Sequence, residues 1–142
     1  MKKFYVAYGS NLNLSQMAFR CPTAKVVGKG KIKDWSLEFW RVATIVPNEG
    51  EEVPVGVWEI DEICEKALDR YEGFPRLYRK EDIEVEMFDG SKVTGMVYIM
   101  NKENAERPSM MYYHTIKTGY EEIGIDPKKL YEALKRSVEK SA

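Results

Sequence analysis

The sequence has few residues of the kinds that bind metals or carry redox chemistry. It contains two cysteines, Cys21 and Cys64, and a single histidine, His114. These three residues cannot build a zinc site of the usual cysteine–histidine type, and two cysteines cannot make a disulfide-dense secreted scaffold. The spacing gives Cys21 no nearby base and gives His114 no serine or cysteine partner. A hydrolase with a nucleophile–histidine pair is therefore not favoured.

The chain also lacks an excess of charge and any long hydrophobic run. Its 22 lysines and arginines face 23 aspartates and glutamates, for a formal net charge of −1. This balance removes the electrostatic case for a general binder of nucleic acid or membrane surfaces. No apolar run approaches the roughly 20 residues of a transmembrane helix, and Met1–Lys3 leads into a strand-like segment rather than a signal peptide. We expect a cytoplasmic protein without nucleic-acid or membrane partners.

Core-forming residues, by contrast, are plentiful. Of 142 residues, 44% are hydrophobic and 12% are aromatic. A chain of this length has room for about one domain, which would bury enough surface for a self-sufficient core. With no repeat or linker visible, a single domain over residues 1–142 is predicted.

Strand signals dominate residues 4–100. Aromatic and β-branched residues at 4–8 are followed by Gly9–Asn11, which favour a turn. Pro47–Gly50 predicts a second turn, and Asp89–Gly90 predicts a hairpin. The further strands are predicted over 24–32, 35–41, 43–46, 53–60, 78–88 and 92–100.

Helix signals are clearest in the middle and at the end of the chain. Asp61 is a suitable N-cap, an apolar stripe follows at helical spacing, and Gly73 is the expected terminator, so a helix is predicted over 61–72 with Glu72 as its last residue. One or two helical turns are predicted over 14–19, one helix from Pro108–Ser109 to Ile123, and another from Asp126–Pro127. Strands followed by helices indicate an α+β fold.

Several residues have ordinary interpretations. Cys64 falls on the apolar stripe of the 61–72 helix and is expected to be plain core packing, and Cys21 is expected to be structural or inert. His114 is expected to be solvated or hydrogen-bonded in a structural role. A row of lysines at 25, 29, 31 and 33 is interpreted as the solvated face of a strand, with a small nucleic-acid patch as the alternative.

The segment Tyr8–Leu12 directly follows the first strand and is less ordinary. A glycine turn at a strand end can leave several backbone amides pointing one way and make a small anion-binding nest. From turn chemistry alone, a plain strand exit is the alternative.

Glu72 is the second unusual residue. The negative end of the helix dipole and the flanking Tyr71 and Phe74 would raise the pKa of its carboxyl toward the range of a general base or acid. Arginines near it in sequence, at 70, 76 and 79, would lower that pKa if they pointed inward. The alternative interpretation is a solvated surface glutamate.

Three motifs in order carry a family resemblance: FYVAYGSNL at 4–12, LDRYEG at 68–73, and Pro108–Ser109 followed by Tyr112. With them the chain resembles the γ-glutamylcyclotransferase family of AIG2-like and BtrG-like small barrel proteins. The resemblance implies a mixed β-barrel of about five to seven strands with packed helices. It also implies an enzyme that needs no cofactor or metal and that closes a γ-glutamyl group to 5-oxoproline, releasing an amine or amino acid.

The resemblance assigns roles to individual residues. Glu72 would be the catalytic acid and base, the amides around Gly9, Ser10, Asn11 and Leu12 would bind the substrate, Tyr112 would hydrogen-bond it, and Tyr8 would shape the wall. The leaving group is left open between a free amino acid, a lysine side chain and a biosynthetic amine, and the oligomeric state is left open with a homodimer included. The alternatives are a non-catalytic binding module for a γ-glutamyl or small carboxylate ligand, and a structural or interaction protein on the same scaffold.

Overall fold

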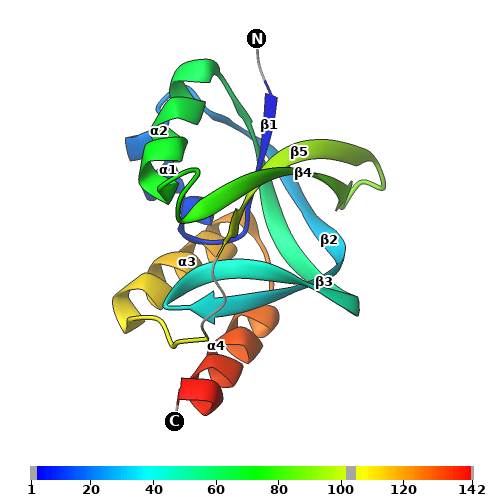
Figure 1. Ribbon diagram of the computed structural model, residues 1–142. Coiled ribbons are helices and arrows are strands. Elements are labelled where there is room, and N and C mark those ends of the chain that lie inside the picture. Colours follow the sequence, from blue (N-terminus) through cyan, green and yellow to red (C-terminus); the bar gives the residue numbers. More distant parts are fainter. Residues whose placement is uncertain (1–2, 102–104, 142) are drawn as a thin grey trace.

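The computed structural model describes residues 3–101 and 105–141, which form a closed barrel of strands packed against helices (Figure 1). Around the barrel the strands follow the order β1, β3, β2, β4, β5. The strands are β1 (Lys3–Ala7), β2 (Lys25–Trp40), β3 (Val42–Ile60), β4 (Tyr78–Met87) and β5 (Lys92–Met100). The helices are the short 3-10 helix η1 (Ser10–Leu12), α1 (Leu14–Arg20), α2 (Glu62–Glu72), α3 (Met110–Ile123) and α4 (Lys128–Ser141). The predicted α+β fold with a mixed barrel is confirmed.

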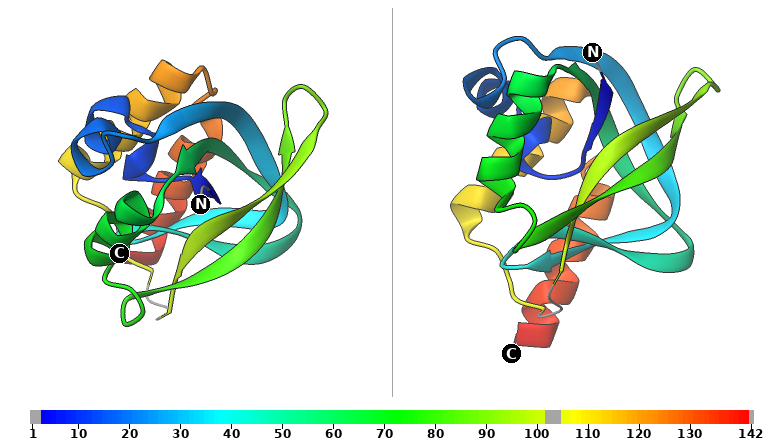
Figure 2. Two further views of the ribbon diagram at one scale, coloured as in Figure 1. Left: turned by 90° about the horizontal axis from the view of Figure 1, so that it is seen from above. Right: turned by 45° about the horizontal axis from the view of Figure 1, so that its top comes forward.

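The barrel is mixed because β1 closes it with two different pairings. β1 pairs antiparallel with β3, and it pairs parallel with β5 through Tyr5 and Met96. The remaining neighbours, including the long β2–β3 hairpin, are antiparallel. The helices gather on one side of the molecule, while the tip of the β4–β5 hairpin projects away from them (Figure 2).

Local capping chemistry explains where the helices begin and end. At the start of α2, the Asp61 carboxylate accepts a hydrogen bond from the Cys64 amide at 2.8 Å, and Gly73 ends the helix with a left-handed φ of 66°. Ser109 caps α3 in the same way, since its hydroxyl oxygen accepts from the Tyr112 amide at 3.1 Å. Both helices lie where the sequence predicts them. None of the described helices is long and apolar enough to span a membrane.

The predicted turn at Pro47–Gly50 is wrong, because these residues lie within β3. The β2–β3 hairpin turns instead at Arg41, which has a φ of 69° and connects the paired residues Trp40 and Val42. Residues 48–51 face the single residue Asp34, whose carboxylate accepts a hydrogen bond from the Gly50 amide at 3.0 Å. The turn-forming residues therefore make an irregularity inside a continuous hairpin rather than its end.

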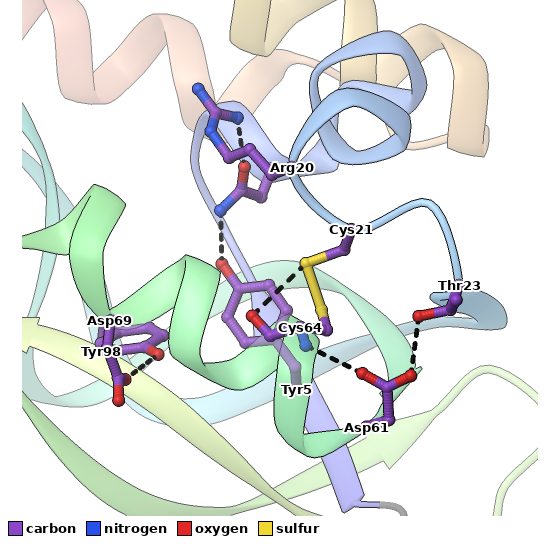
Figure 3. The surroundings of a disulfide bond; sticks show 9 residues. Tyr5, Arg20, Cys21, Thr23, Asp61, Cys64, Asp69 and Tyr98 are labelled. Atoms are coloured by element: carbon purple, nitrogen blue, oxygen red, sulfur yellow. Dashed lines mark hydrogen bonds between the residues drawn. A yellow bond between two sulfur atoms is a disulfide. The ribbon is translucent and has the colours of Figure 1, made fainter.

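The two cysteines are buried, as expected for Cys64, but Cys64 is more than plain core packing and the role of Cys21 is structural. Cys21 and Cys64 form a disulfide bond with their Cα atoms 5.0 Å apart (Figure 3). The bond joins the residue that follows α1 to the first turn of α2, across 43 positions in the sequence. The barrel strands between the two cysteines bring them together, and no local sequence pattern reports such a contact.

The lysine row on β2 contacts groups of the neighbouring elements. Lys31 pairs with Glu52 at 3.4 Å, Lys33 pairs with Glu86 at 3.0 Å, and Lys29 donates to the Gly124 carbonyl at 2.6 Å. These contacts fit the interpretation of a solvated strand face, where the charges are met by groups of β3, β4 and the end of α3.

Candidate active site

A cavity of about 260 Å³ opens where β1, η1 and the C-terminal end of α2 meet. Its walls combine residues that lie far apart in the sequence, so the barrel is what assembles it. The side chains and backbone that line it belong to Tyr5, Val6, Tyr8, Gly9, Ser10, Asn11, Val42, Ala43, Tyr71, Glu72, Leu77, Tyr78, Tyr98 and Tyr112.

Glu72 reaches this cavity as the last residue of α2 and is half-buried there. Burial raises the pKa of its carboxyl from 4.5 to about 7, and the positive charge of Arg20 partly opposes the rise. Within residues 3–101 and 105–141, no hydrogen bond or ion pair occupies its carboxylate. A carboxyl poised near neutrality and unoccupied by protein partners can take up and release a proton in the working pH range.

The arginine that acts on Glu72 is distant from it in sequence. Arg70 and Arg76 are exposed, and Arg79 pairs with Glu81 at 2.6 Å. Arg20, at the end of α1, instead places its guanidinium carbon 3.4 Å from the centre of the Tyr71 ring. Nearness in sequence therefore did not identify the charge that opposes the rise in the Glu72 pKa.

The loop after β1 lines the same cavity. Tyr8, Gly9, Ser10 and Asn11 all line it, and Ser10 shares a hydrogen bond of 2.9 Å with the Tyr71 hydroxyl on the Glu72 side. Glu72 and the first glycine turn, which the sequence analysis placed in one site, thus lie against the same small volume. Tyr112 of α3 also lines it.

Leu12 is the exception among the predicted substrate-binding residues, and its assignment is corrected. Its side chain is fully buried in the core, it does not line the cavity, and its amide donates to the Gly9 carbonyl at 3.0 Å. That internal bond closes the turn of η1, so the Leu12 amide is not available to a ligand. The Leu12 side chain instead anchors the loop by packing in the core.

Gly119 explains how α3 can support the same loop. A Cβ atom at this position would lie 2.5 Å from the Leu12 carbonyl carbon and 2.6 Å from the Asn13 nitrogen. The helix therefore packs directly on the loop backbone, which only glycine allows. The Asn13 side chain adds a second tie by donating to the Thr115 carbonyl at 3.0 Å.

Six of the nine tyrosines line the cavity. Their hydrogen bonds show which hydroxyl protons are already used within the protein. Tyr8 donates to the Tyr98 carbonyl at 2.6 Å, and Tyr78 donates to the Ala43 carbonyl at 2.7 Å, so both hydroxyl protons are already hydrogen-bonded within the protein. The Tyr112 oxygen instead accepts from the Ala43 amide at 3.0 Å, which leaves its O–H to donate toward the cavity. The cavity is therefore a tyrosine-walled space that offers hydroxyl donors to a ligand.

A charged network anchors the outer side of this wall. The Tyr98 hydroxyl donates to the Asp69 carboxylate at 2.6 Å (Figure 3), and Lys80 pairs with Asp69 at 3.0 Å and with Glu65 at 2.8 Å. These contacts fasten α2 to the β4–β5 hairpin. Among the residues that the structure describes, no group of three or more His, Cys, Asp or Glu is arranged to hold a metal ion.

Among the residues that sequence reasoning missed are Tyr5, Tyr78 and Tyr98 of the cavity wall and Arg20, whose charge acts on Glu72. A signal for the tyrosines was present, because nine in 142 residues is a high content and several fall in predicted strands. No comparable signal marked Arg20, whose role depends on α1 and α2 lying together.

Comparisons with known proteins identify the same family that the sequence motifs resemble. The sequence model of the family described as "Gamma-glutamyl cyclotransferase, AIG2-like" matches residues 5–117. The mouse protein named γ-glutamylcyclotransferase is 31% identical over 144 residues, which cover 92% of this chain and 76% of that protein. The human protein of the same name is 30% identical with the same coverage.

Solved structures agree. One titled "Gamma-glutamyl cyclotransferase" superposes with a TM-score of 0.86 at 26% identity, covering 94% of this chain and 86% of the other. The family match spans the first loop, α2 with Glu72, and α3 through Tyr112, which are the elements that build the cavity. The chain belongs to the γ-glutamyl cyclotransferase, AIG2-like family and is an enzyme of the cyclotransferase type.

Proposed function

We propose that this enzyme converts a γ-glutamyl amide or γ-glutamyl amino acid to 5-oxoproline and a free amine, with Glu72 moving the proton. The observation that carries the proposal is the position of Glu72: half-buried, with a pKa raised to about 7, in a small cavity that the Tyr8–Asn11 loop also lines. A solvated surface glutamate would have neither property.

The ring nitrogen must lose two protons on the way from ammonium to lactam N–H, and the leaving nitrogen must gain one. The α-ammonium of the glutamyl group loses its first proton to solvent, and the resulting amine attacks the γ-carbonyl carbon to form a five-membered ring while the Glu72 carboxylate takes the second proton from the attacking nitrogen. The bond from that carbon to the leaving nitrogen then breaks as Glu72 returns the proton to that nitrogen. A single group can serve both steps because its pKa lies close to the working pH.

Attack within one substrate makes shape the main contribution of the cavity. Holding the glutamyl chain folded, with its amine against its own carbonyl, can lower the barrier by up to about 7–11 kcal/mol. A space of about 260 Å³ walled by tyrosines suits a group of this size. The leaving group would extend from the cavity toward its mouth.

Donors of the loop after β1 would hold the negative oxygens of the substrate. The amides of Ser10 and Asn11 begin η1, where the first amides of a helix have no acceptor within the helix. Together with Gly9 they would receive the α-carboxylate or the oxygen of the γ-carbonyl as it gains charge. Tyr112, whose O–H is left to donate, would add a hydrogen bond to the bound glutamyl group, and Tyr8 would shape the wall.

The direct test is product formation by a panel of substrates. The purified protein is incubated with γ-glutamyl dipeptides, ε-(γ-glutamyl)-lysine and glutathione, and 5-oxoproline is measured by mass spectrometry. Glu72→Gln should lower turnover by about 10²–10⁴-fold, the range typical for loss of a general acid–base group. Glu62→Gln, on the exposed first turn of the same helix, is the matched control and should be unaffected.

Other outcomes distinguish the alternatives. Full activity in Glu72→Gln would refute the role of Glu72 while leaving the reaction in place. Ligand binding without product, in wild type and variant alike, would instead indicate a binding module.

A further inference from the structure

We propose that Arg20 is a positioning residue of this active site: it fixes the side-chain amide of Asn11, which in turn directs the Tyr5 hydroxyl proton into the cavity. This inference rests on the proposed function, since it assigns how the substrate-facing donors of that site are oriented. Arg20 itself does not line the cavity.

Arg20 joins three elements at one point. It is the last residue of α1, and its guanidinium carbon lies over the Tyr71 ring, 3.4 Å from the ring centre, in the last turn of α2. One guanidinium nitrogen donates to Gln16 one turn back in α1 at 2.7 Å, and the other donates to the Asn11 Oδ1 atom in η1. A planar group held on its face and along two edges has little freedom left.

The contact with Asn11 has a direction. A guanidinium carries only donors, so the atom of Asn11 that faces Arg20 must be the amide oxygen. The Asn11 Nδ2 atom is thereby turned toward Tyr5 and donates to its hydroxyl oxygen at 3.0 Å. An Asn11 side chain flipped by half a turn would place two donors against each other at the guanidinium.

The chain of bonds ends at a free proton. The Tyr5 oxygen accepts from Asn11, and among the described residues no protein acceptor takes the Tyr5 proton. Tyr5 is buried and lines the cavity, and burial raises the pKa of its hydroxyl above the ordinary value, so the proton stays on the oxygen. The Tyr5 O–H is therefore set to donate to an oxygen of a bound glutamyl group.

Arg20 also acts on Glu72 through its charge. Its positive charge lowers the pKa of Glu72 against the effect of burial. The Tyr71 hydroxyl lines the same cavity. Five further hydroxyls interact with Glu72, and because burial raises their pKa values they remain neutral and exert no comparable field. They come from β1 and the residue after it, β4, β5 and α3: Tyr5, Tyr8, Tyr78, Tyr98 and Tyr112.

Two substitutions of Arg20 separate orientation from charge. Arg20→Gln removes both and should lower kcat/KM by about 10- to 100-fold, the loss expected for a charge-assisted hydrogen bond in a buried site. It should also shift the acid limb of the pH profile upward. Arg20→Lys keeps the charge without the planar fork, so the acid limb should stay in place while kcat falls.

Tyr5→Phe removes only the final donor and should lower kcat/KM without moving the acid limb. Arg70→Gln, an exposed arginine on the last turn of α2, is the matched control and should resemble wild type. Thermal unfolding is measured for each variant, and if Arg20→Gln does not fold, Arg20→Lys and Tyr5→Phe decide the question.

A titration of the Glu72 carboxyl by ¹³C NMR, assigned by comparison with Glu72→Gln, tests Arg20 without any turnover. The inference is overturned if the Glu72 pKa is the same in Arg20→Gln and wild type, if Arg20→Lys retains wild-type kcat, or if Tyr5→Phe retains wild-type kcat/KM. A wild-type protein that makes no 5-oxoproline would refute the proposed function instead, and the NMR titration would still judge Arg20.

Discussion

The two walls of the cavity are held in place by different kinds of contact. The Glu72 wall is the end of α2, a helix whose start at Asp61 and stop at Gly73 are set by neighbouring residues. The other wall, the Tyr8–Asn11 loop, is held by Arg20 of α1 and, through the adjoining Leu12 and Asn13, by Gly119 and Thr115 of α3. The ends of the helix that carries the acid are therefore set by local rules, although contacts of Asp69 and Glu65 with the β4–β5 hairpin hold the helix in place. The loop that carries the donors depends on contacts between distant parts of the chain.

Breaking the covalent link between the two sides should have the largest effect on stability. The disulfide closes the chain from Cys21 to Cys64. For a loop of this length the chain-entropy account predicts that Cys21→Ala with Cys64→Ala lowers the free energy of unfolding by about 4 kcal/mol. Urea unfolding measures the change, and wild type in excess dithiol should match the double variant. A loss below about 1 kcal/mol would contradict the prediction.

Adding a side chain where α3 packs on the loop after β1 should disturb that loop and leave the Glu72 wall in place. Gly119→Ala places a methyl group against the backbone of Leu12 and Asn13, and we expect a loss of about 3 kcal/mol together with lower formation of 5-oxoproline. Thr118→Ala, on the exposed side of α3, is the control for helix composition. Wild-type stability and activity in Gly119→Ala would show that the loop does not depend on this approach.

Replacing Glu72 by a neutral residue should stabilise the protein in a pH-dependent way. Because the folded-state pKa of Glu72 is raised from 4.5 to about 7, wild type loses stability relative to Glu72→Gln as pH rises through this window. The variant should gain about 2 kcal/mol over wild type between pH 4 and pH 8, after allowance for partial exposure. Unfolding curves at several pH values measure it, and a difference that does not change with pH would count against the burial of this carboxyl.

Removing the local cap at the far end of α2 should have the smallest effect. Asp61→Ala deletes the acceptor for the Cys64 amide and should cost about 1 kcal/mol, whereas Asp61→Asn should retain most of the capping. Activity should persist in both variants, because Glu72 lies at the opposite end of the helix. Loss of turnover in a folded Asp61→Ala protein would mean that the position of Glu72 depends on the far end of α2.

Much of the fold was predictable where neighbouring residues decide it. The caps of α2 and α3 and the Asp89–Gly90 hairpin carry their own stop and start signals, and the structure has these elements where the sequence predicts them. The Pro47–Gly50 turn failed because turn-forming residues can equally form an irregularity in a long hairpin. Composition in that stretch does not distinguish the two outcomes.

The site was predictable to a lesser extent, and for a related reason. Glu72 stood out because a helix end and flanking aromatic residues can be read from sequence, and the motif resemblance pointed to the first loop. Leu12 was misassigned because a motif does not show which of its amides is used internally. The contacts of Arg20 and the disulfide could not be predicted, because both form only when α1 and α2 lie side by side.

The disulfide has one more consequence for the irregular part of the β2–β3 hairpin. Residues 48–51 are the exposed stretch of β3 that faces Asp34, and they lie between Cys21 and Cys64 in the chain. A protease cut within this stretch would leave two fragments that remain covalently joined. A nicked molecule would migrate as one band in a non-reducing gel and as two bands after reduction, and the barrel would keep both halves of its hairpin.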